Sequence, residues 1–140
     1  VRTPERRERT EQVRTPERRE RTEQAERLAE LLGADAWGNN ESLLLLGDLN
    51  AHDEPEVLEA LAAHGLRDCW IAAHTQDGDG LTSPSERPVQ RIDYVLVPEQ
   101  STDIDTVTPD GGQQWHELSD HLPTMVQFTL PTIGTVKKPS

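Results

Sequence analysis

The 140-residue chain is poor in several residue types on which whole classes of protein depend. Its single cysteine, Cys69, excludes an internal disulfide framework and a cysteine-based zinc site, and we expect it to be a small buried apolar residue. Aromatic residues make up only 4% of the chain and hydrophobic residues 33%. No apolar run approaches the roughly 20 residues of a membrane helix, and the first residues are rich in Arg and Glu. We therefore expect a soluble chain without a membrane span, in a compartment that the sequence leaves open.

Positive charge is also scarce. The chain has 14 Lys and Arg against 26 Asp and Glu, which gives a net charge of -12. The imbalance lies beyond residue 24, because residues 1–24 contain eight Arg and six Glu. Such an acidic body repels a phosphate backbone and lacks the basic surface of a stand-alone nucleic-acid-binding protein, although divalent cations can reverse the local sign of charge. The charge therefore disfavours nucleic acid as a partner.

A twelve-residue unit, VRTPERRERTEQ, occurs twice in tandem, at 1–12 and 13–24. Two copies with one Val each are too few and too polar for a stacked repeat array, so we interpret them as a local duplication. We expect residues 1–13 to be disordered, residues 14–131 to form one domain and residues 132–140 to form a tail.

One helix is predicted directly after the duplication. Apolar residues recur there at helical spacing: Ala25, Leu28, Ala29 and Leu32. The pattern predicts a helix from about Pro16 to Leu32, with Thr15 as the N-cap and Gly33 as the C-terminal stop.

A second helix is predicted after residue 53. Its apolar face consists of Val57, Leu58, Leu61 and Ala62. Asp53 and Glu56 have the spacing of a capping pair, and Gly65 is the expected end of the helix.

The remaining apolar segments predict strands. Residues 43–46, four leucines, have the length of a buried strand. Residues 91–97 alternate and are apolar on both sides, with Ile92, Tyr94 and Leu96 on one face and Val95 and Val97 on the other. We expect residues 66–73 to be short helix or irregular, residues 101–114 to be an exposed strand and turn, and residues 123–130 to be the last strand.

Three short segments place polar groups beside these strands: GDLN at 47–50, RIDY at 91–94 and SDHLP at 119–123. In layered α/β folds, residues just beyond strand ends face the crevice where ligands bind. Asp48 and Asn50 are two positions apart and would point to the same side of an extended segment. A carboxylate next to an imidazole, with further carboxylates, suits divalent-metal-assisted hydrolysis.

Simpler interpretations remain open for several of these residues. Asp48 and Asn50 could instead form a turn capped by their own side chains. A calcium-loop interpretation of the same stretch fails, because Asp53 stands where Gly is required and Pro55 lies inside the loop. We expect Tyr94 to be a core residue. We expect the remaining histidines to be surface or capping residues: His52, His64, His74 and His116.

In this order and at this spacing, GDLNA, RIDYVLV and LSDHLP resemble the C-terminal half of the endonuclease/exonuclease/phosphatase superfamily. The stretch RERTEQAERLAELL resembles the family's Arg/Gln-bearing helix, so that the resemblance covers about residues 14–130. It implies an α/β (α+β) fold, namely half of a four-layer α/β/β/α sandwich with a mixed sheet and flanking helices.

Carried over by position, the resemblance also implies roles for individual residues. Asp48 would orient or deprotonate the attacking water, and Asn50 would hydrogen-bond the scissile phosphate. Asp93 would hydrogen-bond His121, which would contact the phosphate or act as the acid or base. Asp120 would belong to the coordination sphere of a metal ion, Mg²⁺ or Mn²⁺, which hard oxygen ligands prefer.

The family's N-terminal motifs, including its metal-binding Glu, have no counterpart in these 140 residues. The resemblance implies a metal-dependent phosphoesterase acting on a phosphoester substrate, and we expect this chain alone to be weak or inactive. The alternative is a non-catalytic remnant or interaction module that pairs with another chain. We also expect self-association, because half of a sandwich leaves an apolar sheet face uncovered.

Overall fold

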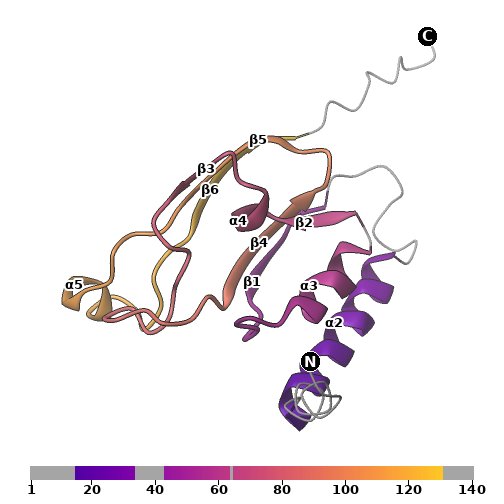
Figure 1. The fold of residues 1–140 in the computed structure, drawn as a ribbon, viewed down its shortest axis with the longest axis horizontal. Helices are drawn as coiled ribbons and strands as arrows, with labels where there is room; N and C mark the ends of the chain where they lie inside the picture. The colour runs from indigo at the N-terminus through magenta and orange to yellow at the C-terminus, as the bar shows by residue number, and fades with distance from the viewer. Residues whose placement is uncertain (1–14, 34–42, 64, 131–140) are drawn as a thin grey trace, which may run out of the picture.

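The computed structural model describes residues 15–33, 43–63 and 65–130. Figure 1 shows its helices and strands along the chain. In order they are α2 (Pro16–Gly33), β1 (Leu45–Asp48), α3 (Pro55–Ala62), β2 (Leu66–Asp68), α4 (Cys69–Ala72), β3 (Thr75–Asp77), β4 (Asp93–Pro98), β5 (Thr102–Val107), α5 (Gln113–His116) and β6 (Met125–Thr129). The segment 1–13, expected to be disordered, and the tail at 132–140 lie outside the described residues.

The strands form two sheets of three strands each within the described part of the chain. In the first sheet, β4 is central and pairs antiparallel with β1 and with β2. In the second sheet, β5 is central, with β3 parallel and β6 antiparallel to it. The chain therefore has the expected mixed α/β fold.

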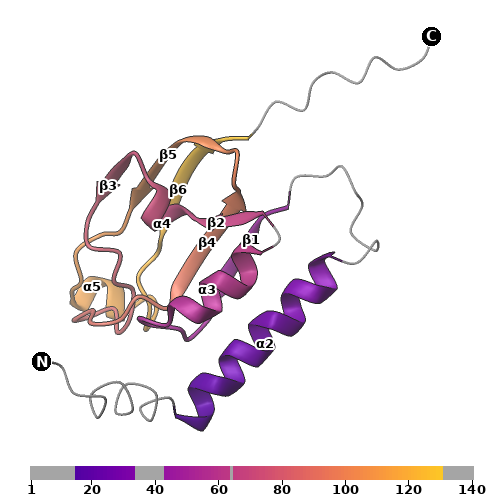
Figure 2. The same ribbon diagram turned by 45° about the vertical axis from the view of Figure 1, so that its right-hand side comes forward.

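Strand β4 is covered on both faces, as its alternating pattern predicts. Tyr94 and Leu96 are buried in a core shared with α2 and α3, whereas Val97 packs with Ile104 of the second sheet. Figure 2 shows α2 and α3 on one side of β4 and the strands β5 and β6 on the other. The second core also contains Cys69, which is buried as expected, and burial raises the pKa of its thiol to about 11.

The start of α2 follows from its first residues. The Thr15 hydroxyl accepts a hydrogen bond from the backbone N–H of Arg18 (3.2 Å), which confirms Thr15 as the N-cap, and Pro16 occupies the first turn, where no N–H is needed. Ala25 and Ala29 form its buried face, and their small side chains allow close packing against α3. Among the described residues, no helix combines the length and the hydropathy needed to cross a bilayer.

The capping pair predicted for α3 is wrong. The helix begins at Pro55, the N-cap residue Glu54 makes no side-chain cap hydrogen bond, and Asp53 has a left-handed backbone with φ +53°. The neighbouring carboxylates bind α2 instead. The buried Glu54 pairs with Arg21 at 2.7 Å, and Glu56 pairs with Arg18. Both partners are ionised in a carboxylate–guanidinium pair and two N–H groups donate to each carboxylate, whereas only the carboxylate is charged in a capping bond, so the tertiary contact prevails.

Strand β1 begins two residues later than predicted and is not a buried strand. In the described part of the chain it pairs only with β4, and Leu44 and Leu46 are 41% and 66% exposed. A strand needs cover on both faces to bury consecutive leucines, and β1 lies at a sheet edge.

Three further segments differ from the sequence-based expectation. Strand β2 occupies the start of 66–73, and β3 lies within a stretch rich in turn-forming residues, because three-residue strands carry no readable alternation. The segment expected to be an exposed strand is β5, where Ile104 and Thr106 are buried between β3 and β6. The polar composition of β5 does not indicate its central position in the sheet.

Candidate functional site

The ends of β1 and β4 bring two aspartates opposite each other. In the antiparallel register of the two strands, Asp48 is paired with Asp93. The pairing continues beyond the strand end, since the Leu49 N–H donates to the Ile92 carbonyl at 2.8 Å. Directly opposed residues on neighbouring strands have closely spaced side chains, so two carboxylates gather at one edge of the sheet.

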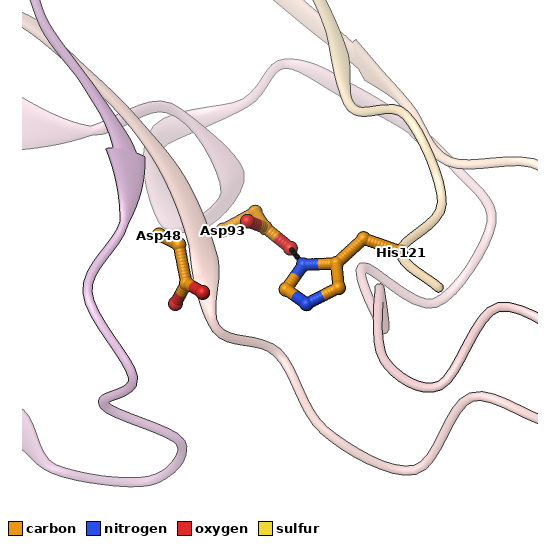
Figure 3. Close-up of side chains that lie close together, drawn as sticks. All are labelled: Asp48, Asp93 and His121. Atoms are coloured by element: carbon orange, nitrogen blue, oxygen red, sulfur yellow. Dashed lines mark hydrogen bonds and ion pairs between the residues drawn. The ribbon is translucent and has the colours of Figure 1, made fainter. Parts of the chain in front are cut away.

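His121 approaches Asp93 from the loop between α5 and β6. Its Nδ1 lies 2.8 Å from the Asp93 carboxylate, and the two side chains are 28% and 24% exposed (Figure 3). The hydrogen bond to Asp93 raises the pKa of His121, partial desolvation opposes this change, and the negative charges of Asp93, Asp120 and Asp48 add to it. Since a carboxylate only accepts hydrogen bonds, Nδ1 is the donor and Nε2 remains available for other chemistry.

Asp48, Asp93 and His121 together form a group that could hold a divalent metal ion. One ligand atom from each of the three side chains lies within 4.8 Å of the other two. Carboxylate oxygens suit Mg²⁺ and Mn²⁺, so the donor set fits such an ion. Because Nδ1 of His121 is engaged by Asp93, the carboxylate oxygens are the better-placed ligands. The arrangement can combine a cation, an acid or base, and a water molecule in one place.

Asn50 does not continue the extended segment. The chain turns after Asp48, and Asn50 has a left-handed backbone with φ +51°. The Asp48 carboxylate accepts a hydrogen bond from the Asn50 N–H at 2.8 Å, which is the capped turn left open by the sequence. The two interpretations of Asp48 are therefore compatible, because the carboxylate both caps the turn and faces Asp93 and His121.

The turn after β1 is held in place by Tyr94. Its ring is buried as expected, and its hydroxyl lies 2.5 Å from the Ala51 carbonyl and 3.1 Å from the Arg91 carbonyl. His52 closes the same turn, since its Nδ1 accepts a hydrogen bond from the Arg91 N–H at 2.9 Å. His52 is thus an exposed capping residue, as the sequence suggests.

A groove of about 260 Å³ opens between α2 and the end of β1. Its polar lining comes from Asp48 and Asn50 on one side and from Arg21 and Gln24 of α2 on the other. The Arg/Gln-bearing helix expected from the sequence therefore borders the candidate site. Arg21 is also held by Glu54, so its guanidinium stabilises the contact between α2 and α3.

Asp120 does not belong to the group of Asp48, Asp93 and His121. Its side chain is exposed, its carbonyl accepts a hydrogen bond from the Ser85 N–H, and its charge contributes to the raised pKa of His121. The structure places it next to the candidate site, and its role as a metal ligand stays a prediction.

Arg91 is a residue that the sequence reasoning missed. Its guanidinium stacks over the Tyr94 ring at 4.4 Å and pairs with Asp68 of β2 at 2.7 Å. These contacts anchor the residue two positions before Asp93. The only sequence signal was its place in RIDY, three positions before an aromatic residue.

These features define a layered α/β protein with an acidic, histidine-containing site beyond the ends of two strands. A model of the Endonuclease/Exonuclease/phosphatase family matches residues 3–121. The chain belongs to this family. Comparison with curated proteins found no match.

Solved structures share the fold. The mannosyl-6-phosphatase Bt3783 of Bacteroides thetaiotaomicron has 21% sequence identity and a TM-score of 0.61, over 79% of this chain and 46% of that protein. A family protein from Bacteroides vulgatus has 20% identity and a TM-score of 0.64, over 79% of this chain and 44% of its own. One from Leptotrichia buccalis has 19% identity and a TM-score of 0.56, over 74% and 41%. The chain spans less than half the length of these structures.

Proposed function

We propose that the chain carries part of the active site of a metal-dependent phosphoester hydrolase. The observation that supports this proposal most directly is the group of Asp48, Asp93 and His121 at the strand ends of a member of the Endonuclease/Exonuclease/phosphatase family. Activated water attacks phosphorus in such a reaction, so the site needs a base or orienting carboxylate, an acid or base, and positive charge near the phosphate oxygens.

His121 is the proposed acid or base. Asp93 accepts the Nδ1 proton, which fixes the tautomer and directs Nε2 away from Asp93 (Figure 3). The raised pKa keeps a larger fraction of the imidazole protonated near neutral pH, which favours contact with an anionic phosphate or protonation of a leaving group.

Asp48 and Asn50 act on the opposite side of the site. One oxygen of Asp48 accepts the Asn50 N–H, which fixes the rotation of the carboxylate. Its other oxygen is then oriented to accept a hydrogen bond from the attacking water. Asn50 is exposed at the mouth of the groove, where its amide would donate to a phosphate oxygen.

Mg²⁺ or Mn²⁺ is the proposed cofactor, held by the carboxylates of Asp48 and Asp93, with Asp120 as a further proposed ligand. When bound, such an ion would neutralise phosphate charge and lower the pKa of a water molecule. It would also offset the repulsion between the acidic surface and an anionic substrate.

The proposed substrate is a phosphoester, either a monoester or a diester. The name of the Bacteroides thetaiotaomicron relative, a mannosyl-6-phosphatase, makes a phosphorylated sugar a reasonable candidate for this chain too. The net charge of -12 argues against a long nucleic acid, which carries a dense array of phosphates.

The test is hydrolysis of p-nitrophenyl phosphate and bis(p-nitrophenyl) phosphate by the purified chain with Mg²⁺ or Mn²⁺. We expect slow turnover that EDTA and His121→Ala both abolish. His74→Ala is the matched control, because His74 is exposed and belongs to neither the acidic group nor the groove. Turnover that resists EDTA, or that both substitutions reduce equally, would contradict the proposal. Fast turnover would contradict the expectation that the chain alone is weak.

The alternative, an interaction module, is favoured by the exposed leucines at the edge formed by β1. Unpaired edge strands with apolar side chains are templates for pairing with another chain. Sedimentation should then show self-association that Leu46→Lys weakens, whereas Leu118→Lys, at an exposed leucine away from the edge, should have no effect. A monomer at high concentration would exclude pairing between copies of this chain.

A further inference from the structure

A buried serine outside the acidic group holds the loop that carries His121. Ser85 is completely buried (0% exposed) in the loop between β3 and β4. Its N–H donates to the Asp120 carbonyl at 2.8 Å, and its hydroxyl donates to the Ser119 carbonyl at 2.5 Å. Its own carbonyl accepts a hydrogen bond from the Gly112 N–H at 3.1 Å. Ser85 therefore hydrogen-bonds to both residues that precede His121, Ser119 and Asp120.

The position after His121 is fixed by the same loop. The Leu122 N–H donates to the Thr82 carbonyl at 2.7 Å, and Leu122 is itself buried. His121 thus lies between two attachment points on residues 82–85. A short segment held on both sides leaves its central side chain little freedom to move relative to the supporting loop.

The supporting loop is also attached to Asp93. The Thr82 N–H donates to the Gln90 carbonyl at 2.8 Å, and Gln90 stands three residues before Asp93. Asp93 and His121 are therefore both attached, through hydrogen bonds of neighbouring residues, to one loop, residues 82–90. Gly111 also packs closely against this loop, because a Cβ there would lie 2.3 Å from Pro88 Cδ and 2.9 Å from the Ser85 carbonyl oxygen.

We propose that Ser85 is a positioning residue that sets His121 against Asp93. The hydroxyl is required because Ala would keep the two backbone bonds and lose the one to Ser119, so that the segment before His121 could shift. A catalytic consequence of Ser85 rests on the function proposed above, whereas its effect on the geometry of the Asp93 and His121 pair does not.

The test compares Ser85→Ala with Ser101→Ala. Ser101 is buried to a similar extent (2% exposed), but its hydroxyl has no hydrogen-bond partner within the described residues. We expect Ser85→Ala to shift or broaden the ring ¹⁵N and Nδ1–H signals of His121, and to lower kcat by roughly tenfold with little change in KM. Ser101→Ala should leave these signals and kcat unchanged.

A second measurement needs no variant. In the unmodified chain, the amide protons of Ser85 and Leu122 should exchange with solvent slowly and at similar rates, because each closes one attachment of the His121 segment. Rapid exchange at either amide would overturn the proposal. So would unchanged His121 ring signals in a folded Ser85→Ala variant. If no variant and no unmodified chain hydrolyses a phosphoester, the proposed function fails, while the ring signals and exchange rates still decide whether Ser85 positions His121.

Discussion

Strands β1 and β4 each deliver one aspartate to the candidate site, yet they are stabilised in different ways. Strand β4 has a hydrogen-bonded neighbour on each side and a core on each face. Strand β1 has one neighbour among the described residues, and Leu46 is 66% exposed. The difference indicates that Asp93 is placed by the core, whereas Asp48 depends on local contacts: its turn, Tyr94 and the pairing with β4.

The largest expected difference between the two strands is in stability. Leu96→Ala removes a side chain that is 1% exposed in the centre of β4, and we expect a loss of about 3 kcal/mol in the free energy of unfolding. Leu46→Ala in β1 should cost less than about 0.5 kcal/mol, because its side chain is largely in water. Urea unfolding measures both. Similar losses would show that β1 is as well packed as β4.

The next effect concerns the helix beside β1. Arg21→Ala removes the guanidinium that hydrogen-bonds the buried carboxylate of Glu54 and leaves only Arg18, at 3.8 Å, as its cation. We expect a loss of about 2 kcal/mol, since Arg21 itself is partly exposed and Arg18 compensates in part. Arg27→Ala is the control, because its pair with Glu30 lies on the surface and should be worth less than about 0.5 kcal/mol. Thermal unfolding of the two variants measures both losses of stability. An Arg21→Ala variant as stable as Arg27→Ala would contradict a stabilising role for the buried ion pair.

Metal binding compares the two aspartates directly. We expect Asp48→Asn and Asp93→Asn each to weaken Mn²⁺ binding by about tenfold or more, because each removes a negative charge from the same group. Asp110→Asn, at an exposed aspartate outside that group, controls for net charge. Calorimetric titration gives the affinities. Equal effects of all three substitutions would indicate general charge attraction without a defined site.

Sequence patterns were sufficient where a segment was long or strongly marked. The cap at Thr15 and the spacing of Ala25 and Ala29 predicted α2, and alternation predicted β4 with both faces covered. Strands of three residues, such as β2 and β3, are shorter than one readable alternation. Composition misleads in β5 for a different reason. Its polar residues predict an exposed strand, yet Thr106 is buried in the centre of the sheet.

The candidate site was predicted unevenly for a related reason. The pair of Asp93 and His121 came from the resemblance, since no local spacing relates residues that lie 28 positions apart. The turn at Asn50 was only an alternative to the extended interpretation, although Asn readily adopts the φ > 0 that the turn requires. The support from Ser85 depends on backbone hydrogen bonds between two loops, which no single-sequence pattern encodes.

The smallest expected effect is the pH dependence that His121 confers through its contact with β4. Its pKa is raised in the folded state, first by the hydrogen bond to Asp93, so protonated His121 stabilises the fold. This contribution is fully present below the ordinary histidine pKa of about 6.5 and is lost as the pH rises through the higher folded-state value. We expect less than about 1 kcal/mol, because water partly screens the pair.

Asp93→Asn isolates this contribution, and Asp48→Asn measures the corresponding contribution from β1. In urea unfolding with EDTA, Asp93→Asn should reduce stability more at pH 5.5 than at pH 9, because Asn accepts a hydrogen bond from the ring but carries no charge to favour its protonated form. Asp48→Asn should show the same sign with a smaller difference, since Asp48 acts on His121 only through its charge. A larger difference for Asp48→Asn would mean that the edge strand, and not β4, supplies the main electrostatic partner of His121.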